Sequence, residues 1–137
     1  MTPKTKRLLQ KPTRVLIIVD DVHSIRELHK HLLTNMGFKS IELAADGKQA
    51  LEMLNQAEQN GKAFGLVISD WEMPTMNGIE LLKAVRISKN LWRTPLYLLT
   101  GIVDRNKIIE AITLGVTGYI TKPISPKMFD LKFRDYL

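Results

Sequence analysis

Short apolar runs alternate along the chain with longer segments in which apolar residues recur every three or four positions. The first run, RVLIIVDD, is continuous and β-branched, which is typical of a strand covered on both faces. The runs predict strands at 14–21, 40–45, 64–70, 94–101 and 117–123. The longer segments predict helices at 23–38, 46–62, 77–89, 104–115 and 125–137. Asp46 and Ser125 are suited to cap two of these helices, and Gly37 and Gly115 to end two others.

The order of the elements is strand then helix, repeated five times, with no internal sequence repeat and no interdomain linker. Strands that alternate with helices require right-handed crossovers, which predicts a parallel sheet with helices on both faces. The length of 137 residues fits one such doubly wound α/β domain. Ligands of these sheets bind at the carboxyl ends of the strands. Residues that end a strand are therefore candidates for function.

Polar residues collect at the ends of four predicted strands. They are Asp20 and Asp21, Asp70, Thr100, and Thr121 with Lys122 and Pro123. If the first, third, fourth and fifth strands are neighbours, one pocket holds three carboxylates, a hydroxyl and an ammonium group. Three carboxylates repel one another unless a divalent cation lies between them, and Mg²⁺ suits an oxygen site of this kind. The set resembles the receiving end of phosphoryl transfer, with a carboxylate nucleophile, a metal and donors for the transferred oxygens.

Each of these residues also has an ordinary structural interpretation. An aspartate after a strand is most often a turn residue or a helix cap, and a Lys-Pro pair is most often a turn. Asp20 and Asp21 could cap the first helix, and Thr100 could be a plain strand hydroxyl. Their coincidence at one edge of a regular strand–helix repeat favours a functional site over these separate explanations.

Four stretches of the sequence resemble the receiver domain of two-component response regulators, in particular the CheY-like single-domain response regulators. These stretches are VDD, SDWEMPTMNG, LLTG and GYITKP. The resemblance covers about residues 14–137 and leaves a basic tail at 1–13. It implies a flavodoxin-like (βα)5 fold whose five parallel strands have the order 2-1-3-4-5. It also implies a phospho-accepting signalling domain that catalyses only its own phosphorylation and dephosphorylation.

The resemblance implies a role for each strand-end residue. Asp70 corresponds to the phosphoryl acceptor and to one Mg²⁺ ligand. Asp21 would bind the metal directly with help from Asp20, and the backbone carbonyl of Glu72 would complete the protein ligands. The phosphoryl donor would be a phosphohistidine on a sensor histidine kinase or on a histidine phosphotransfer domain.

The same resemblance implies which residues would respond when the acceptor is phosphorylated. Lys122 would pair with Asp70 and then with the phosphoryl group, and Thr100 would move to bind a phosphoryl oxygen. Tyr119 stands where the family has a rotating aromatic side chain, and Pro123 where it often has a cis peptide bond. These shifts would alter the surface of the fourth helix, fifth strand and fifth helix, where a downstream protein would bind.

Three positions depart from the usual pattern of the family. Gly101 follows Thr100 where alanine is most frequent, which leaves room for the donor and loosens the loop. Glu72 stands where asparagine is frequent, and Ile102 lies two residues past Thr100. Because an acid and a bulky apolar side chain would then flank the path of the attacking water, we expect slow self-dephosphorylation.

Two helices carry residues that need a separate interpretation. In the first helix the apolar residues are Ile25, Leu28, Leu32, Leu33 and Met36. This region also holds His23, His29 and His31; a metal site needs facing ligands, and because His29 and His31 are two residues apart and do not face each other, we expect these histidines to lie on the surface. In the last helix Phe129, Phe133 and Tyr136 can line the core. Met128 and Leu131 then fall on another side, which is either edge packing or a face for a partner or a phosphorylation-dependent homodimer.

Charge and composition narrow the classes of function. The net charge is +6, and five basic residues precede any acid: Lys4, Lys6, Arg7, Lys11 and Arg14. Such a tail is usually solvated, and contact with an acidic partner or nucleic acid is the alternative. The chain has no cysteine, no apolar run that could span a bilayer and no apolar signal core, which together favour a cytoplasmic protein without thiolate chemistry.

Two other classes remain as alternatives. Haloacid-dehalogenase-like phosphatases also use a Mg²⁺-bound aspartate, and Asp70 with Glu72 imitates their paired acids. That family places its nucleophile after the first strand, however, and usually needs a longer chain. A nucleic-acid-binding regulator is suggested by the basic pI near 9.7, but only one helix follows the last strand, so we expect no separate DNA-binding domain.

Overall fold

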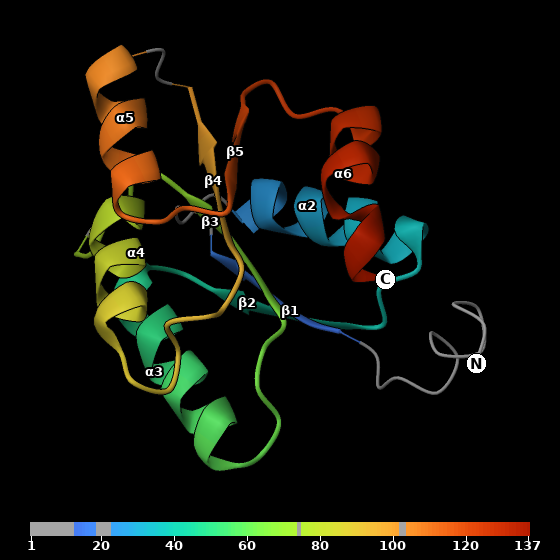
Figure 1. The fold of residues 1–137 in the computed structure, drawn as a ribbon. Coiled ribbons are helices and arrows are strands. Elements are labelled where there is room, and N and C mark those ends of the chain that lie inside the picture. Colours follow the sequence, from blue (N-terminus) through green and yellow to red (C-terminus); the bar gives the residue numbers. More distant parts are fainter. Residues whose placement is uncertain (1–12, 19–22, 74, 102–103) are drawn as a thin grey trace, which may run out of the picture.

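A computed structural model describes residues 13–18, 23–73, 75–101 and 104–137. Five parallel strands form one sheet in the order β2-β1-β3-β4-β5 (Figure 1). The strands are β1 Arg14–Ile18, β2 Ser40–Ala44, β3 Leu66–Asp70, β4 Leu96–Thr100 and β5 Gly118–Thr121. The helices are α2 His23–Met36, α3 Gly47–Gln59, α4 Gly78–Ile87, α5 Arg105–Thr113 and α6 Pro126–Phe133, with a 3-10 turn at Arg134–Tyr136. The predicted fold class and strand order are therefore confirmed.

Two hydrophobic clusters, one on each face of the sheet, hold the layers together. One cluster joins the sheet to α3, α4 and α5, and the other joins it to α2 and α6, as the two sides of Figure 1 show. Every residue of β3 and β4 is buried. Alternate residues serve the two clusters, because successive side chains of a strand point to opposite faces: Val67 and Leu98 belong to one cluster, Ile68 and Leu99 to the other. Continuous apolar strands are the expected result of burial on both faces.

The first helix packs differently from the prediction. Ile25 and Leu28 were expected in its apolar face, yet 39% and 52% of their surfaces are exposed. His29 was expected on the surface and is instead buried, with 2% exposed. The stripe that faces the sheet runs through His29, Leu33 and Met36, which are four and three residues apart and so share one side of a helix. His31 is exposed as expected.

The last helix is shorter than predicted. Its α-helical part ends at Phe133, and the chain continues as a 3-10 turn to Tyr136. Tightening of the last turn is common at helix ends. Here the Tyr136 hydroxyl reaches the Tyr97 hydroxyl at 2.9 Å, and the Phe129 and Phe133 side chains are fully buried as expected. None of the described helices has the length and apolar character needed to cross a membrane.

Candidate functional site

Asp70 ends the central strand β3 and is 4% exposed. It pairs with Leu99 of β4, and the next backbone N–H, of Trp71, donates to the Leu99 carbonyl at 3.0 Å. The chain then returns at once into α4, whose Gly78 N–H donates to the Trp71 carbonyl at 2.9 Å. A Cβ on Gly78 would lie 2.5 Å from the Asp70 carbonyl oxygen, so only glycine allows this close approach. The turn thereby fixes the acceptor candidate at the edge of the sheet.

Lys122 follows β5 and reaches across β4 to Asp70. Its Nζ lies 3.2 Å from Asp70 Oδ1, and its backbone N–H donates to the Thr100 carbonyl at 2.8 Å. The bond to Pro123 is cis. The two side chains differ in exposure, with 41% for Lys122 and 5% for Asp70. A buried carboxylate needs a counter-charge, and this cation supplies one while it stays open to solvent.

Thr100 and Tyr119 lie on the face of the sheet that α3, α4 and α5 cover. Thr100 ends β4, is 1% exposed and pairs with Thr121, whereas Tyr119 pairs with Leu98 two residues earlier. Residues two apart on a strand point to the same face, so both side chains share this side. Tyr119 packs on the hydrophobic cluster of that face. A Cβ on Gly101 would meet nothing within 4 Å, in agreement with the expected room beside Thr100.

The structure describes only two of the expected metal ligands, Asp70 and Glu72. Asp20 and Asp21 lie outside the described residues; the last residue of β1, Ile18, pairs with Ser69, which directly precedes Asp70. Glu72 is exposed on the loop after β3. Among the residues that the structure does describe, no three histidine or acidic side chains gather as a metal site. Ile102 and most of the basic tail, residues 1–12, also lie outside that part.

A shallow cleft of about 180 Å³ adjoins the acceptor loop. It lies between the loop after β3, the start of α4 and α5, and is lined by Trp71, Glu72, Asn77, Ile79, Lys107 and Glu110. Only 5% of Trp71 is exposed, because its side chain packs within the cluster under this cleft.

His29 is a buried polar residue of α2 that the sequence interpretation missed. Its ring centroid lies 5.6 Å from that of Phe129 in α6. Burial, and then the positive charge of Lys122, lower the pKa of the His29 imidazole from 6.5 to about 4. The signal that could have found it is helical spacing: His29 precedes Leu33 by four residues and Met36 by seven.

The geometry at the sheet edge agrees with a comparison to protein families. Residues 16–133 match the model of the response regulator receiver domain. The chain belongs to this family. The receiver domain is 41% identical over 118 residues to the chemotaxis protein CheY-3 of Vibrio cholerae, with 86% of each chain covered. It is 38% identical over 117 residues to the chemotaxis protein CheY of Pseudomonas aeruginosa, covering 85% of this chain and 90% of that one.

Solved structures show the same fold for this receiver domain. The chemotaxis protein CheY4 of Vibrio cholerae superposes with a TM-score of 0.78 at 34% identity, covering 91% of this chain and 99% of that chain. The receiver domain of the sensor histidine kinase PA1611 from Pseudomonas aeruginosa has a TM-score of 0.72 at 18% identity, covering 90% and 97%. That structure holds a magnesium ion in its active-site cleft.

Proposed function

We propose that this receiver domain accepts a phosphoryl group on Asp70 from a phosphohistidine of a sensor histidine kinase or a histidine phosphotransfer domain. The observation that carries the proposal is the buried Asp70 carboxylate, which ends the central strand 3.2 Å from the Lys122 ammonium. A carboxylate oxygen of Asp70 attacks phosphorus in line, the P–N bond breaks, and the electron pair leaves with the imidazole. Lys122 stabilises the negative charge on the phosphoryl oxygens during transfer.

The residues at this edge fit a magnesium ion. The Asp70 carboxylate and the Glu72 backbone carbonyl would hold it together with the side chains of Asp20 and Asp21. All of these are oxygen donors, which are the ligands that Mg²⁺ prefers. When bound, the ion neutralises charge on the phosphoryl oxygens. The position of Lys122, whose side chain is partly exposed, leaves it able to follow the phosphoryl group.

The readout would run through Thr100 and Tyr119 to the surface of α5, β5 and α6. The hydroxyl of Thr100 would turn to a phosphoryl oxygen, and the Tyr119 ring would move inward against the cluster on its face. A groove of about 290 Å³ lies beside β5 and α6 and is lined by Gly118, Tyr119, Ile120, Thr121, Met128 and Lys132. Met128 and Leu131 are 38% and 55% exposed, which suits a downstream protein or a second copy of the chain better than edge packing.

This function is that of a cytoplasmic signalling protein and not of an enzyme with a separate substrate. Membership of the receiver family favours it over a phosphatase. Nucleic acid is not needed as a partner, since the excess positive charge belongs largely to the first fourteen residues. Sedimentation with and without beryllofluoride tests the homodimer: a higher mass only with the phosphomimic supports it, and an unchanged mass counts against it.

The deciding experiment adds beryllofluoride and Mg²⁺ while Trp71 fluorescence is followed. We expect a saturable change that Asp70→Asn abolishes. Asp46→Asn is the matched control, because Asp46 caps α3 by accepting from Gln49 N–H at 2.8 Å, and asparagine caps equally well. Absence of any change in the wild type, together with turnover of small phosphoesters, would instead support the phosphatase.

A further inference from the structure

The end of α4 and the loop that follows it combine exposed apolar side chains with basic ones. Ile87, the last residue of α4, is 81% exposed, and Trp92 in the loop is 51% exposed. Residues 81–103 include four basic residues and no acidic one: Lys83, Arg86, Lys89 and Arg93. Tryptophan and arginine are enriched where proteins contact one another, so this segment is a candidate interaction surface.

The loop after α4 is fixed by hydrogen bonds and packing, although it is exposed. The Trp92 N–H donates to the Ser88 carbonyl at 3.1 Å, which closes a turn beside the end of α4. Leu91 is 2% exposed and packs in the cluster under α3, α4 and α5. Arg86 donates to the carbonyls of Trp92 at 3.0 Å and Thr94 at 2.7 Å. A partner would therefore meet a preformed surface, so little conformational entropy would be lost on binding.

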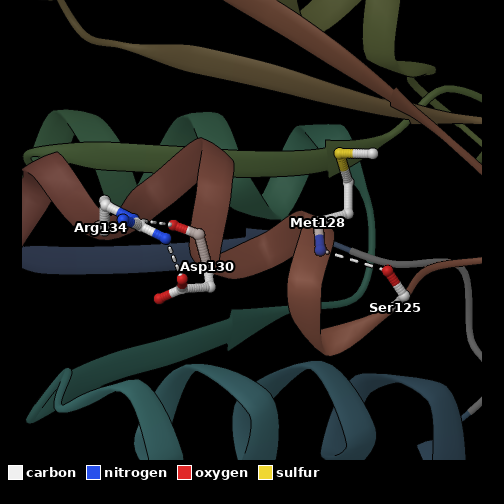
Figure 2. A network of polar contacts seen from close by, with 4 residues as sticks. All are labelled: Ser125, Met128, Asp130 and Arg134. Carbon is white, nitrogen blue, oxygen red and sulfur yellow. Dashed lines mark hydrogen bonds and ion pairs between the residues drawn. The ribbon is translucent and has the colours of Figure 1, made fainter.

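Two arginines in other parts of the molecule are neutralised within the chain. Arg134 pairs with Asp130 one turn earlier on α6 (Figure 2). Arg14 of β1 pairs with Glu42 of the neighbouring strand β2 at 3.2 Å. A cation that already has a carboxylate beside it gains less from an acidic partner than a cation that has none.

The basic side chains around the end of α4 are placed differently. Among the residues that the structure describes, no carboxylate lies within ion-pair distance of Lys83, Lys89 or Arg93, and all three are exposed. Lys83 precedes Ile87 by four residues, so the two share one side of α4. The Arg93 guanidinium lies over the Trp92 ring, 4.6 Å from its centroid. We call these five residues the α4-end patch, which presents apolar and positively charged groups together.

The α4-end patch is centred at the opposite end of the sheet from the acceptor. The loop leads to Pro95, whose carbonyl accepts from the Val67 N–H at 2.9 Å near the start of β3, and Asp70 ends that strand. The helix α4 begins beside the acceptor at Gly78 and ends at Ile87, and nine residues of helix span roughly 14 Å. A ligand of the loop would therefore bind away from the phosphoryl group.

We propose that the α4-end patch is a docking surface for an acidic segment of another protein, and that it binds this segment whether or not Asp70 is phosphorylated. Trp92 and Ile87 would contact an apolar side chain of the segment, and Lys89 and Arg93 would pair with its carboxylates. Truncation of tryptophan and arginine gives some of the largest losses at protein interfaces. A second copy of the chain fits poorly, because a two-fold interface would place this positive patch against itself.

Nucleic acid and anionic membranes are the other ligands that positive charge attracts. Single-stranded nucleic acid binds largely by stacking bases on aromatic rings, but Arg93 already lies over the Trp92 ring, and Ile87 is aliphatic. Binding to a membrane surface scales with the apolar area that is buried, and only two apolar side chains are exposed in this patch. An acidic protein segment with an apolar anchor fits both properties of the patch.

The first test titrates the full chain with a set of synthetic peptides in which aspartate and glutamate surround a leucine or phenylalanine. The two tryptophan indole N–H signals are followed by NMR. We expect the Trp92 signal to shift and saturate, whereas Trp71, which is 5% exposed and follows the acceptor, should keep its signal. Peptides with amides in place of the acids, or alanine in place of the apolar anchor, should bind at least about tenfold more weakly. If no acidic peptide shifts the Trp92 signal, or if Trp71 shifts equally, the proposal is wrong.

The second test uses variants of the patch. Trp92→Ala should weaken peptide binding at least about tenfold, and Lys89→Glu about fivefold. Lys30→Glu is the matched control, because Lys30 is exposed on α2, on the other face of the sheet, and the change in net charge is the same. Equal weakening by Lys30→Glu and Lys89→Glu would show that only net charge attracts the peptide, which would contradict a docking surface. If a variant misfolds in a urea titration, the wild-type NMR titration still decides.

The third test separates this surface from other ligands and from the proposed function. Single-stranded DNA and vesicles of anionic lipid, at the same salt concentration, should bind more weakly than the acidic peptides. Tighter binding to either one that Trp92→Ala abolishes would overturn the proposal. Beryllofluoride with Mg²⁺ should leave the peptide affinity unchanged, and binding only in its presence would assign the peptide to the switched surface instead. A chain that binds the peptide but accepts no phosphoryl group would refute the proposed function alone.

Discussion

A basic side chain lies at each end of the sheet, but the two side chains contact different kinds of group. At the carboxyl end Lys122 is partly exposed and lies 3.2 Å from the Asp70 carboxylate. At the amino end Arg86 of α4 donates to three backbone carbonyls: Gly115 at 2.8 Å, Thr94 at 2.7 Å and Trp92 at 3.0 Å. Its fourth contact is the Thr117 hydroxyl at 3.4 Å. Lys122 pairs with a carboxylate, whereas Arg86 donates to neutral carbonyl and hydroxyl groups and so joins the segments that carry them.

The contacts of Arg86 hold the amino end of the sheet together, and the proposed reaction takes place at the carboxyl end. Arg86 ties the loop before β4 to the turn before β5, where Gly115 has a positive φ of 91°. Burial lowers the pKa of the Arg86 guanidinium, yet its fixed fork of donors is nearly filled by carbonyls. In the proposed function, α5 and β5 would respond at the carboxyl end while these bonds hold the amino end of the sheet in place. The predictions below test this division, beginning with the largest effect.

Replacement of Arg86 by alanine should lower the free energy of unfolding by roughly 2–3 kcal/mol. The change leaves several carbonyls of two loops without a charged donor, and such bonds are worth about 1.5–3 kcal/mol each before solvent replaces part of them. Urea unfolding measures the loss, and Lys83→Ala on the exposed side of α4 is the control. At urea concentrations below the midpoint of its unfolding, the Arg86→Ala protein should still be phosphorylated. If Arg86→Ala is as stable as the wild type but no longer accepts a phosphoryl group, then Arg86 serves the reaction and not the stability of the fold, and our assignment of the two ends is wrong.

Acid should lower the free energy of unfolding through His29, which is buried beside Phe129 of α6. The folded pKa is about 4 and the ordinary value 6.5, so the unfolded chain binds the proton first as pH falls. The stabilisation by the neutral ring is complete above pH 6.5 and is lost progressively toward pH 4. Between pH 7 and 5 we expect about 2 kcal/mol less unfolding free energy from this residue. His29→Leu should remove that part of the pH dependence, and an equal slope in both proteins would contradict it.

Lys122→Ala should show the reverse of the Arg86 result. Its removal takes a counter-charge from the buried Asp70 carboxylate, but the 41% exposure of the lysine screens the pair, so the unfolding free energy should fall by about 1–2 kcal/mol, less than in Arg86→Ala. Phosphorylation by acetyl phosphate should nevertheless slow by more than about tenfold, as expected when a donor to the transferred group is lost. A large loss of stability with a normal rate of phosphorylation would mean that Lys122 mainly stabilises the fold, as Arg86 does.

The smallest effect concerns the phosphate lifetime. Glu72 is exposed two residues after Asp70, and Glu72→Asn should speed self-dephosphorylation roughly two- to fivefold, which corresponds to an exposed charge interaction of up to about 1 kcal/mol. Glu110→Gln, across the same cleft, should leave the lifetime unchanged. The half-life of the phosphorylated protein after removal of the donor is the measurement. An unchanged half-life in Glu72→Asn would refute the role of this side chain.

The carboxyl end was more predictable from sequence than the amino end. The β3 and β4 positions follow from apolar runs, and the rule that strand ends share one edge brought Asp70 and Lys122 together across 52 residues of chain. The contacts of Arg86 were not predicted from the sequence. Its main partners are backbone carbonyls, which do not depend on the side chains of those residues and so leave no pattern in the sequence. The burial of His29 could have been predicted from its helical spacing with Leu33 and Met36, whereas its ring contact depends on Phe129 in a distant helix.

The central claim is that Asp70 receives the phosphoryl group, and mapping of the modified residue tests it most directly. The protein is incubated with acetyl phosphate and Mg²⁺, the acyl phosphate is reduced with borohydride to give homoserine, and the peptides are sequenced by mass spectrometry. We expect homoserine at position 70 alone, retained in Arg86→Ala and Asp46→Asn and absent from Asp70→Asn. Modification at another residue, or none in the folded wild-type protein, would contradict the account.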